Sequence, residues 1–253
     1  MKPEERRRHI LATVRSRGMA EVTSVACDLQ VSPETVRRDL SALESRGLIR
    51  RTYGAAYPLQ SAAFETSFAD RAGPHAAAKS RIAKAAVRRI ESAETIFVDE
   101  GHTLEVLAGA LPADRPLTVI TAAAETATAI VDSPHLTVLL LGGRLKSRTR
   151  STAGSWTCGM LAGFVIDLAF MGTSRISREH GLTTHDPSVA DVKAKALEVS
   201  RRRVLLGHHS KFGTSTLSRF AEVADFEAII TDTGLPAAEA RRYELLGPRV
   251  HRV

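Results

Sequence analysis

The chain has 253 residues, of which 43% are hydrophobic, and a formal net charge of +7. This length predicts one large domain or two modest ones, and the apolar fraction is ample for a folded core. No apolar run is long enough to span a bilayer, and the charged beginning MKPEERRRHI is unlike a signal peptide, so we expect a cytoplasmic protein with no membrane partner.

The positive charge is distributed unevenly along the chain. Residues 1–58 carry eleven Lys or Arg against seven Asp or Glu, a net charge of +4, whereas the remaining 195 residues carry a net charge of +3. Because clustered basic residues attract polyanions, this asymmetry indicates an anionic partner for the N-terminal part. Cys27 and Cys158 lie far apart without metal-ligand spacing, and we expect both to be buried free thiols.

Three helices and a hairpin are predicted within residues 1–58. The first two helices cover PEERRRHILATVRSRG and VTSVACDLQ, where apolar residues recur with helical spacing. In VSPETVRRDLSALESRGLIRR, Ser32 is a good N-cap and Pro33 suits the first helical position. Gly47 should end this helix, and LIRRTYGAA then resembles two short strands around a glycine turn.

This order of elements is typical of a winged helix-turn-helix domain that binds double-stranded DNA. A helix fits the major groove and reads base edges with its N-terminal residues, while wing residues contact phosphates. The alternative is an ordinary solvated helix face, which the cap, the preceding helix, the wing and the charge excess together disfavour. The predicted DNA-binding residues are Ser32, Thr35, Arg37, Arg38, Arg50, Arg51 and Tyr53.

Residues 76–253 follow a predicted linker at 59–75 and alternate between helices and apolar strands. The predicted strands are TIFVD, LTVIT, LTVLLLGG, DLAFMG, RVLLG and AIITD, and the predicted helices include 103–111, 122–132, 156–163, 188–202 and 235–244. This alternation indicates an α/β domain with a mainly parallel sheet covered on both faces.

The ends of these strands carry the candidate ligand-binding residues. Ligands of open parallel sheets bind where the strands stop, and glycines there allow backbone N–H groups to approach an anion. Gly101, Gly142, Gly143 and Gly172 are such glycines, Thr103 would open a helix, and Lys211 adds a positive charge. We therefore expect a pocket for a small anionic molecule at this edge.

Both parts of the chain resemble the DeoR family of bacterial transcription regulators. The N-terminal resemblance rests on Ser32, Thr35, Arg37-Arg38-Asp39-Leu40, Leu43-Glu44, Gly47 and Gly54-Ala55-Ala56. The C-terminal resemblance rests on Asp99, Gly101 and Thr103, Leu141-Gly142-Gly143, Phe170-Met171-Gly172, Ser210-Lys211-Phe212 and Thr231-Asp232. The family's larger domain is related in fold to ribose-phosphate isomerase.

The resemblance implies a repressor of a carbohydrate or related operon that is released by a phosphorylated sugar-like effector. It implies a homo-oligomer, dimer or tetramer, without a cofactor. The effector-binding residues would be Asp99, Gly101, His102, Thr103, Thr121, Gly142, Gly143, Gly172, Lys193 and Lys211. The sequence departs from the family pattern at Ala122, which replaces an amide, at residues 207–209, which lack an acid, and at His102.

Two alternatives remain open. One is a sugar-phosphate isomerase-like enzyme, which would need a positioned base; Asp99 is retained, but no convincing acid–base pair is present, so we expect no enzyme. The other is a regulator that has lost its effector. Among the remaining signals, the histidines do not predict a metal site, RLKSRTR at residues 144–150 resembles a solvated edge strand, and Trp156 is expected in the core.

Overall fold

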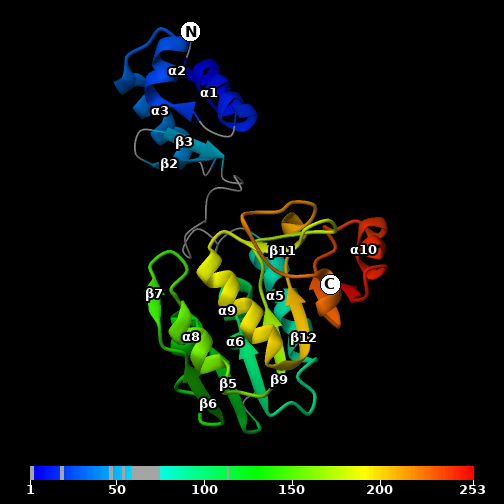
Figure 1. Cartoon of the computed structure of the whole chain (residues 1–253). Coiled ribbons are helices and arrows are strands. Elements are labelled where there is room, and N and C mark those ends of the chain that lie inside the picture. Colours follow the sequence, from blue (N-terminus) through cyan, green and yellow to red (C-terminus); the bar gives the residue numbers. More distant parts are fainter. Residues whose placement is uncertain (1–2, 18–19, 46–47, 53–54, 59–74, 113) are drawn as a thin grey trace. The chain divides into compact units, whose positions relative to one another are not determined.

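A computed structural model describes residues 3–17, 20–45, 48–52, 55–58, 75–112 and 114–253 (Figure 1). The chain divides into two compact units, Met1–Phe64 and Glu65–Val253. The predicted linker at 59–75 lies outside the described residues except for His75, so the predicted domain bounds remain predictions. Among the described residues, no helix combines the length and the apolar composition needed to cross a bilayer.

The N-terminal unit is a winged helix-turn-helix. It contains α1 (Pro3–Arg17), α2 (Val22–Asp28) and α3 (Pro33–Ser45), with an antiparallel sheet of β1 (Ala20–Glu21), β3 (Ala55–Pro58) and β2 (Ile49–Thr52) in that order. The expected stripe of Val36, Leu40 and Leu43 is buried, and it packs in one core with side chains of α1 and α2. The antiparallel pairing of β2 with β3 confirms the predicted hairpin, whose turn at Tyr53 and Gly54 lies outside the described residues.

The cap predicted for the third helix is present. The Ser32 hydroxyl accepts a hydrogen bond from the Thr35 backbone N–H at 3.2 Å, and Pro33 is the first helical residue. A side-chain oxygen at this position satisfies one of the backbone donors that a helix start leaves unpaired. The start of α3 is thus fixed by local sequence alone.

The larger unit is built on a seven-stranded sheet in the order β15-β14-β12-β9-β4-β5-β6, in which every neighbouring pair is parallel. The strands are β4 (Thr95–Val98), β5 (Leu117–Thr121), β6 (Leu136–Leu140), β9 (Ile166–Met171), β12 (Ser200–Leu206), β14 (Ala228–Thr231) and β15 (Arg249–Arg252). The chain adds strands outward from β4 in one direction and then, from β9, in the other. The fold class is the predicted α/β arrangement.

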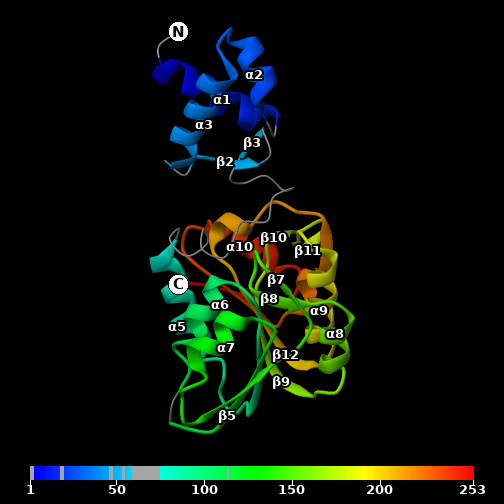
Figure 2. The ribbon, with the colours of Figure 1, turned by 90° about the vertical axis from the view of Figure 1, so that its left-hand side faces the viewer.

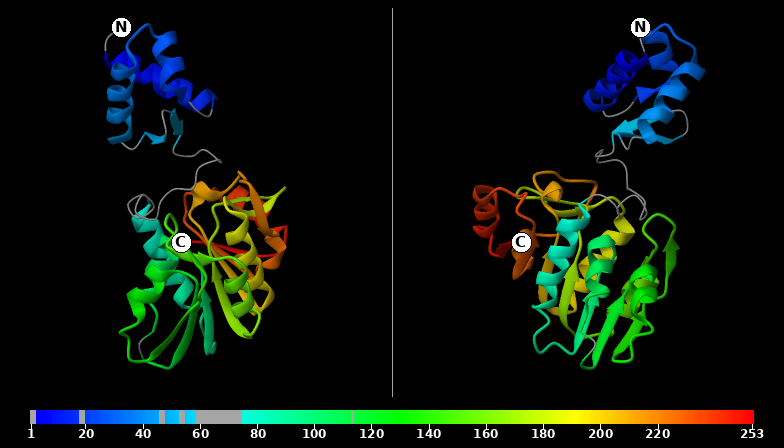
Figure 3. Two further views of the ribbon diagram at one scale, coloured as in Figure 1. Left: turned by 60° about the vertical axis from the view of Figure 1, so that its left-hand side comes forward. Right: turned by 180° about the vertical axis from the view of Figure 1, so that it is seen from behind.

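Helices cover both faces of the sheet. They are α5 (Ala76–Val87), α6 (His102–Ala108), α7 (Ala124–Ile130), α8 (Ser155–Leu161), α9 (Pro187–Glu198) and α10 (Ala237–Glu244). Figures 2 and 3 show α5, α6 and α7 on one side of the sheet and α8 and α9 on the other. The short helix η1 (His209–Lys211) follows β12, and the short helix η2 (Val223–Asp225) follows β13 (Ser218–Ala221).

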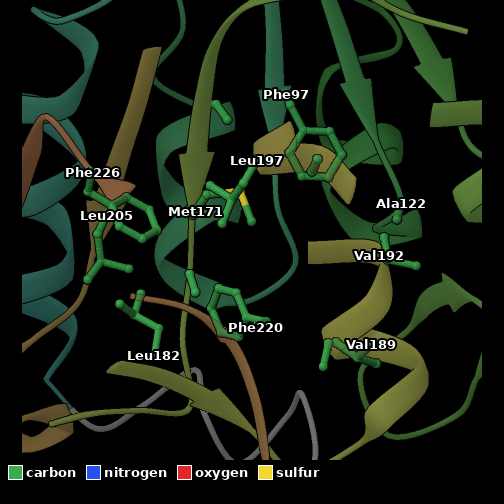
Figure 4. Packing of buried hydrophobic residues seen from close by; sticks show 14 of the residues in the cluster. Phe97, Ala122, Met171, Leu182, Val189, Val192, Leu197, Leu205, Phe220 and Phe226 are labelled. Carbon is green, nitrogen blue, oxygen red and sulfur yellow. The ribbon is translucent and has the colours of Figure 1, made fainter. Parts of the chain in front are cut away.

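Successive residues of each central strand enter different cores, because side chains alternate across a strand. Phe97 of β4 and Met171 of β9 lie in the core beneath α8 and α9, whereas their neighbours Val98 and Phe170 lie in the core beneath α5 and α6. Figure 4 shows Met171 near Leu197 of α9, and Leu205 beside Phe226. Burial on both faces explains why these strands are continuously apolar in the sequence.

Two smaller sheets lie outside the main sheet. One has the order β10 (Arg175–Ser177), β11 (Gly181–Thr184) and β13 (Ser218–Ala221). The other is the hairpin of β7 (Arg144–Lys146) and β8 (Ser151–Ala153). The prediction of one edge strand across residues 144–150 is therefore wrong, since the chain turns after Lys146 and residues 147–150 form the turn of the hairpin.

Three other predictions require correction. The helix expected at 188–202 ends at Glu198, because Ser200 already pairs with β9 in the sheet. Trp156 is not in the core but is 80% exposed on α8. Cys27 is exposed on α2 and Cys158 is partly buried, and both are free thiols. The errors at Trp156 and the cysteines share a cause, because residue type alone does not say which face of a helix meets a neighbour.

Candidate functional sites

The outer face of α3 presents the predicted base-reading arginines to solvent. The Arg37 guanidinium donates a hydrogen bond to the Glu34 carboxylate at 3.1 Å, and both side chains are exposed. Arg38 is exposed and, with the residues that the structure describes, forms no hydrogen bond or ion pair. An exposed ion pair contributes little to stability, so Arg37 can leave Glu34 at little cost to meet another anion.

The inner face of the same helix carries a buried acid, Asp39. Its carboxylate forms ion pairs with Arg6 and with Arg7 of α1, the latter at 2.9 Å. Asp39 follows Val36 by three positions, so it belongs to the buried stripe. A buried carboxylate needs charged or hydrogen-bonding partners, and here they fix α3 against α1. The position of an acid within an apolar stripe is visible in the sequence and indicates a buried ion pair, but the sequence does not show which residues are its partners.

The wing is attached to the end of α3 through Arg51. Its guanidinium donates to the Ser41 hydroxyl and to the Arg37 carbonyl oxygen at 3.3 Å, while its backbone N–H donates to the Glu44 carboxylate at 3.0 Å. In this structure Arg51 therefore orients the wing relative to the helix. The Arg50 side chain and Tyr53 lie outside the described part, so phosphate contact by the wing remains a prediction.

Asp99, Gly172 and Lys193 meet between β4 and β9, where the winding direction of the sheet reverses. The Asp99 carboxylate accepts hydrogen bonds from the Gly172 backbone N–H at 2.8 Å and from the Lys193 ammonium. Lys193 also donates to the Gly172 carbonyl oxygen at 3.3 Å. Such a reversal point is where open α/β sheets bind ligands. The structure thus brings together three of the predicted effector-binding residues.

Glu100 is a fourth member of this group that sequence reasoning missed. Its carboxylate lies 3.5 Å from the Lys193 ammonium and is almost fully buried. Burial raises the pKa of Asp99, and the charge of Glu100 adds to that rise, while Lys193 and the Gly172 N–H oppose it. One lysine thus shares its charge between two acids.

The start of α6 follows directly from this group. Gly101 has a φ of +120°, a conformation that favours glycine, and its carbonyl oxygen accepts from the N–H groups of Leu104 and Glu105. His102 Nδ1 lies 2.7 Å from the Glu105 carboxylate, and Thr103 is buried. The predicted effector-binding residues Gly101, His102 and Thr103 therefore lie together at the start of α6, directly after Asp99 and Glu100 in the sequence.

The predicted residues after β5 and β6 have local packing contacts. The Thr121 hydroxyl accepts a hydrogen bond from the Ala123 N–H at 3.0 Å. The Gly142 carbonyl oxygen accepts from the Thr157 hydroxyl of α8 at 2.8 Å, and a Cβ at Gly143 would lie 2.2 Å from that hydroxyl oxygen. The glycine pair therefore allows α8 to approach the sheet, and its part in binding an anion remains a prediction.

A histidine-rich group occupies the ends of β12 and β14. His209 donates its backbone N–H to Asp232 at 2.7 Å, and its Nδ1 lies 2.7 Å from the same carboxylate. His208 stacks on His75 with ring centroids 4.5 Å apart. Burial, aided by the charge of Lys211, lowers the pKa of His208 to about 3, so its ring is neutral near pH 7. Among the described residues, no group of three or more His, Cys, Asp or Glu is placed to hold a metal ion.

These features define a class: a winged helix-turn-helix unit in one chain with a parallel α/β domain that gathers polar residues at its strand ends. A model of the DeoR-like helix-turn-helix domain matches residues 6–62, and a model of the DeoR C terminal sensor domain matches residues 74–233. The chain therefore belongs to the DeoR family.

Individual relatives match along almost the whole chain. The HTH-type transcriptional regulator GlpR of Haloferax volcanii is 31% identical over 99% of this chain and 98% of its own length. The glycerol-3-phosphate regulon repressor of Escherichia coli K12 is 30% identical over 94% of each chain. The putative aga operon transcriptional repressor of Escherichia coli O157:H7 is 29% identical over 92% of this chain and 87% of its own length.

Solved structures resemble part of this chain at low sequence identity. Ribose 5-phosphate isomerase A from Methanocaldococcus jannaschii is 16% identical, with a TM-score of 0.40 over 55% of each chain. The probable sor operon regulator from Shigella flexneri is 8% identical, with a TM-score of 0.44 over 68% of this chain and 88% of that chain.

Replacing Asp39 tests the contact that holds α3 against α1. Asp39→Ala should lower the free energy of opening of α1 and α3 by about 2–3 kcal/mol, because Arg6 and Arg7 lose a buried partner. Hydrogen exchange of α1 and α3, measured by mass spectrometry, reports this energy. Glu34→Ala removes only an exposed ion pair and should change it by less than about 0.5 kcal/mol. Equal protection in both variants would contradict the role of Asp39.

The buried His208 should make stability depend on pH. Its pKa is about 3 in the folded chain against 6.5 ordinarily, so the unfolded chain binds the proton first as pH falls. Unfolding free energy should therefore fall by on the order of 3 kcal/mol between pH 7 and pH 4 from this group. In urea unfolding at both pH values, His208→Gln should reduce the loss, whereas exchange of the exposed His135 for Gln should not. An unchanged pH dependence in His208→Gln would show that this ring contributes nothing.

Proposed function

We propose that this protein is a DNA-binding transcription regulator, a repressor, whose operator affinity is modulated by a small phosphorylated metabolite. The carrying observation is the division of α3 into two faces. Asp39 holds the inner face against α1, and Arg37 and Arg38 are exposed on the outer face. A guanidinium so placed can donate two parallel hydrogen bonds to a guanine edge in the major groove.

The effector-binding part of the proposal rests on the reversal point between β4 and β9. Lys193 supplies a buried positive charge there. Gly101 and Gly172 lie near Lys193, and because they have no side chain a ligand could approach their backbone closely. A phosphate competing for Lys193 would have to displace Asp99 or Glu100, which couples binding to a rearrangement at this edge. A ligand alters DNA affinity only if it favours one arrangement over another, and such a rearrangement would meet that requirement.

The family and the names of its relatives support a regulator over an enzyme. Two relatives are named as repressors, one of the glycerol-3-phosphate regulon and one, putatively, of the aga operon. These names favour a carbohydrate-related operon here too. The carboxylate that an isomerase-like reaction would use, Asp99, is engaged with Lys193 and Gly172. Proton abstraction needs a base free to reach its substrate, so this pairing disfavours catalysis.

A regulator without an effector is the second candidate, and specific residues favour it. Ala122 is buried and offers no amide to a ligand hydroxyl. At the end of β12, the acid of the family pattern is replaced by residues 207–209, and His209 there is bonded to Asp232. Such a protein would bind its operator with the same affinity whether or not metabolites are present. Ligand-binding experiments can distinguish it from a regulator that has an effector.

Arg38→Ala should cost about 1–3 kcal/mol in operator binding and reduce the preference for operator over random DNA, because a base contact is lost. Binding is measured by fluorescence anisotropy at one fixed salt concentration on both duplexes. Arg8→Ala removes an exposed arginine of α1 and should leave the ratio of the two affinities unchanged. Equal losses on operator and random DNA in Arg38→Ala would assign Arg38 to phosphate contact instead.

An effector should raise the stability of the larger unit. A ligand that binds only the folded state stabilises it by about 2.7 kcal/mol at a hundred times its dissociation constant. Thermal unfolding is followed with a panel of sugar phosphates and polyol phosphates, with the unphosphorylated compounds and inorganic phosphate as controls. A shift that requires the phosphorylated compound supports the proposal. No shift across the panel would favour the regulator without an effector.

A further inference from the structure

The start of helix α5 lies beside the ends of β12 and β14. Ile82 of α5 shares a buried core with Leu206 of β12 and Ile230 of β14. His75, the residue directly before the helix, stacks its ring on that of His208 just after β12, with the ring centroids 4.5 Å apart. The backbone N–H groups of the first turn of α5 therefore lie near the polar residues that follow these strands.

This helix start has features that favour an anion. The helix is 12 residues long, its first turn contains no acidic residue, and among the described residues no side chain caps it. Its first three residues, Ala76, Ala77 and Ala78, have small side chains that leave their backbone accessible to a ligand. The N–H groups of a first turn have no partner within the helix and carry a partial positive charge, so they attract anions. Helix starts are common, however, and a specific site needs further groups.

Two lysines add positive charge at this place. Lys79 lies one turn into α5, where its backbone N–H donates to the His75 carbonyl oxygen at 3.0 Å, and its side chain is buried. Lys211 lies in η1, where its backbone N–H donates to the His208 carbonyl oxygen at 3.0 Å. After the larger effect of burial, the charges of Lys211, His75 and Lys79 all lower the pKa of His208. Both ammonium groups therefore act on the same ring.

His208 supplies a hydrogen-bond donor between these charges. Its side chain is only 8% exposed, and its Nδ1 lies 2.9 Å from the Ser210 hydroxyl oxygen. When a serine hydroxyl donates to Nδ1, a neutral ring carries its hydrogen on Nε2. Among the described residues, this Nε2 has no hydrogen-bond partner. A buried donor normally has an acceptor, so a donor without one in the chain points to an acceptor on a ligand.

The nearby acid, Asp232, does not cancel the positive charge. Its carboxylate accepts hydrogen bonds from the backbone N–H groups of His209 at 2.7 Å and Gly234 at 3.1 Å, and it lies 2.7 Å from His209 Nδ1. The charge of Asp232 acts on His208 in the opposite direction to the lysines, and less strongly than either of them. The local balance of charge is therefore positive.

We propose that the start of α5 binds the phosphoryl group of a phosphate monoester, with Lys79 and Lys211 supplying positive charge and His208 donating its Nε2–H. A phosphoryl group carries a charge of about −1.5 to −2 near pH 7 and three strong acceptor oxygens, which match the ammonium, imidazole and backbone donors gathered here. This inference deepens the effector part of the proposed function, on which it rests. It places the phosphoryl group at α5 and leaves Lys193 to the other oxygens of the effector.

The full-length protein is titrated with methyl phosphate at pH 7.5 and constant ionic strength, where the monoester is mostly a dianion because its second pKa is about 6. Histidine ring resonances are followed by NMR, and those of His208 are identified by their loss in His208→Phe. They should shift in a saturable manner, whereas those of the exposed His135 should not. No response of His208 would overturn the proposal. A response to inorganic phosphate and none to methyl phosphate would also overturn it, because the site would then take only the free ion.

The same spectra test the donor. The ring ¹⁵N shifts of His208 should show a neutral imidazole with its hydrogen on Nε2 at pH 7.5. A hydrogen on Nδ1 would make Nε2 an acceptor, which cannot donate to a phosphoryl oxygen, and would contradict the role given to this ring.

Variants assign the binding, measured by calorimetry, to these side chains. His208→Phe keeps a ring to stack on His75 but removes the Nε2–H, and it should weaken methyl phosphate binding at least tenfold. Lys211→Ala should have an effect of similar size. Lys84→Ala removes an exposed ammonium from the last turn of α5 and should leave the affinity unchanged. Circular dichroism confirms that each variant is folded. Unchanged affinity in both His208→Phe and Lys211→Ala would place the phosphoryl group elsewhere.

These measurements use no DNA, and their failure is separate from failure of the proposed function. If a sugar phosphate stabilises the larger unit while neither it nor methyl phosphate affects His208, the effector stands and this site is wrong. If methyl phosphate binds at His208 while no sugar phosphate stabilises the protein, the site stands and the effector part of the proposed function is wrong.

Discussion

The buried ion pair of Lys193 with Asp99 is the interaction on which the arrangement of the strand ends in the larger unit depends. It joins the end of β4, the end of β9 and helix α9 at the point where the sheet reverses its winding. Burying two charges is costly, and the pair persists because the Gly172 backbone satisfies both partners. Its value therefore lies in fixing this edge, since an apolar pair could stabilise the core as well.

The N-terminal unit uses the same device for a different purpose. Asp39 is buried against Arg6 and Arg7, and this contact sets the rotation of α3 about its own axis. The next residues before it in the chain, Arg37 and Arg38, are thereby directed outward. One acid of the R-R-D-L motif thus decides what its two arginines can reach. The basic residues of the N-terminal unit therefore fall into two groups: Arg6 and Arg7 stabilise the fold through Asp39, and Arg37 and Arg38 are exposed.

The histidines near the end of β12 give a physical account of a departure from the family pattern. A carboxylate is missing from residues 207–209, but Asp232 at the end of the adjacent β14 reaches the same place and is held by His209. His208 remains neutral because burial disfavours its charged form. The ends of β12 and β14 thus retain a carboxylate, that of Asp232, and His209 already occupies part of its hydrogen-bonding capacity.

The sequence by itself determined most of the helices and strands and the fold class. Ser32 and Pro33 set the start of α3 through local hydrogen bonding, and continuous apolar strands between helices indicated a parallel sheet, since these signals act over a few residues. Only the tertiary structure decided the strand order, the partners of Asp39 and Lys193, and the exposure of Trp156. Each of these depends on contacts between residues distant in the chain: Lys193 is 94 positions from Asp99, and whether Trp156 is buried depends on what packs against α8.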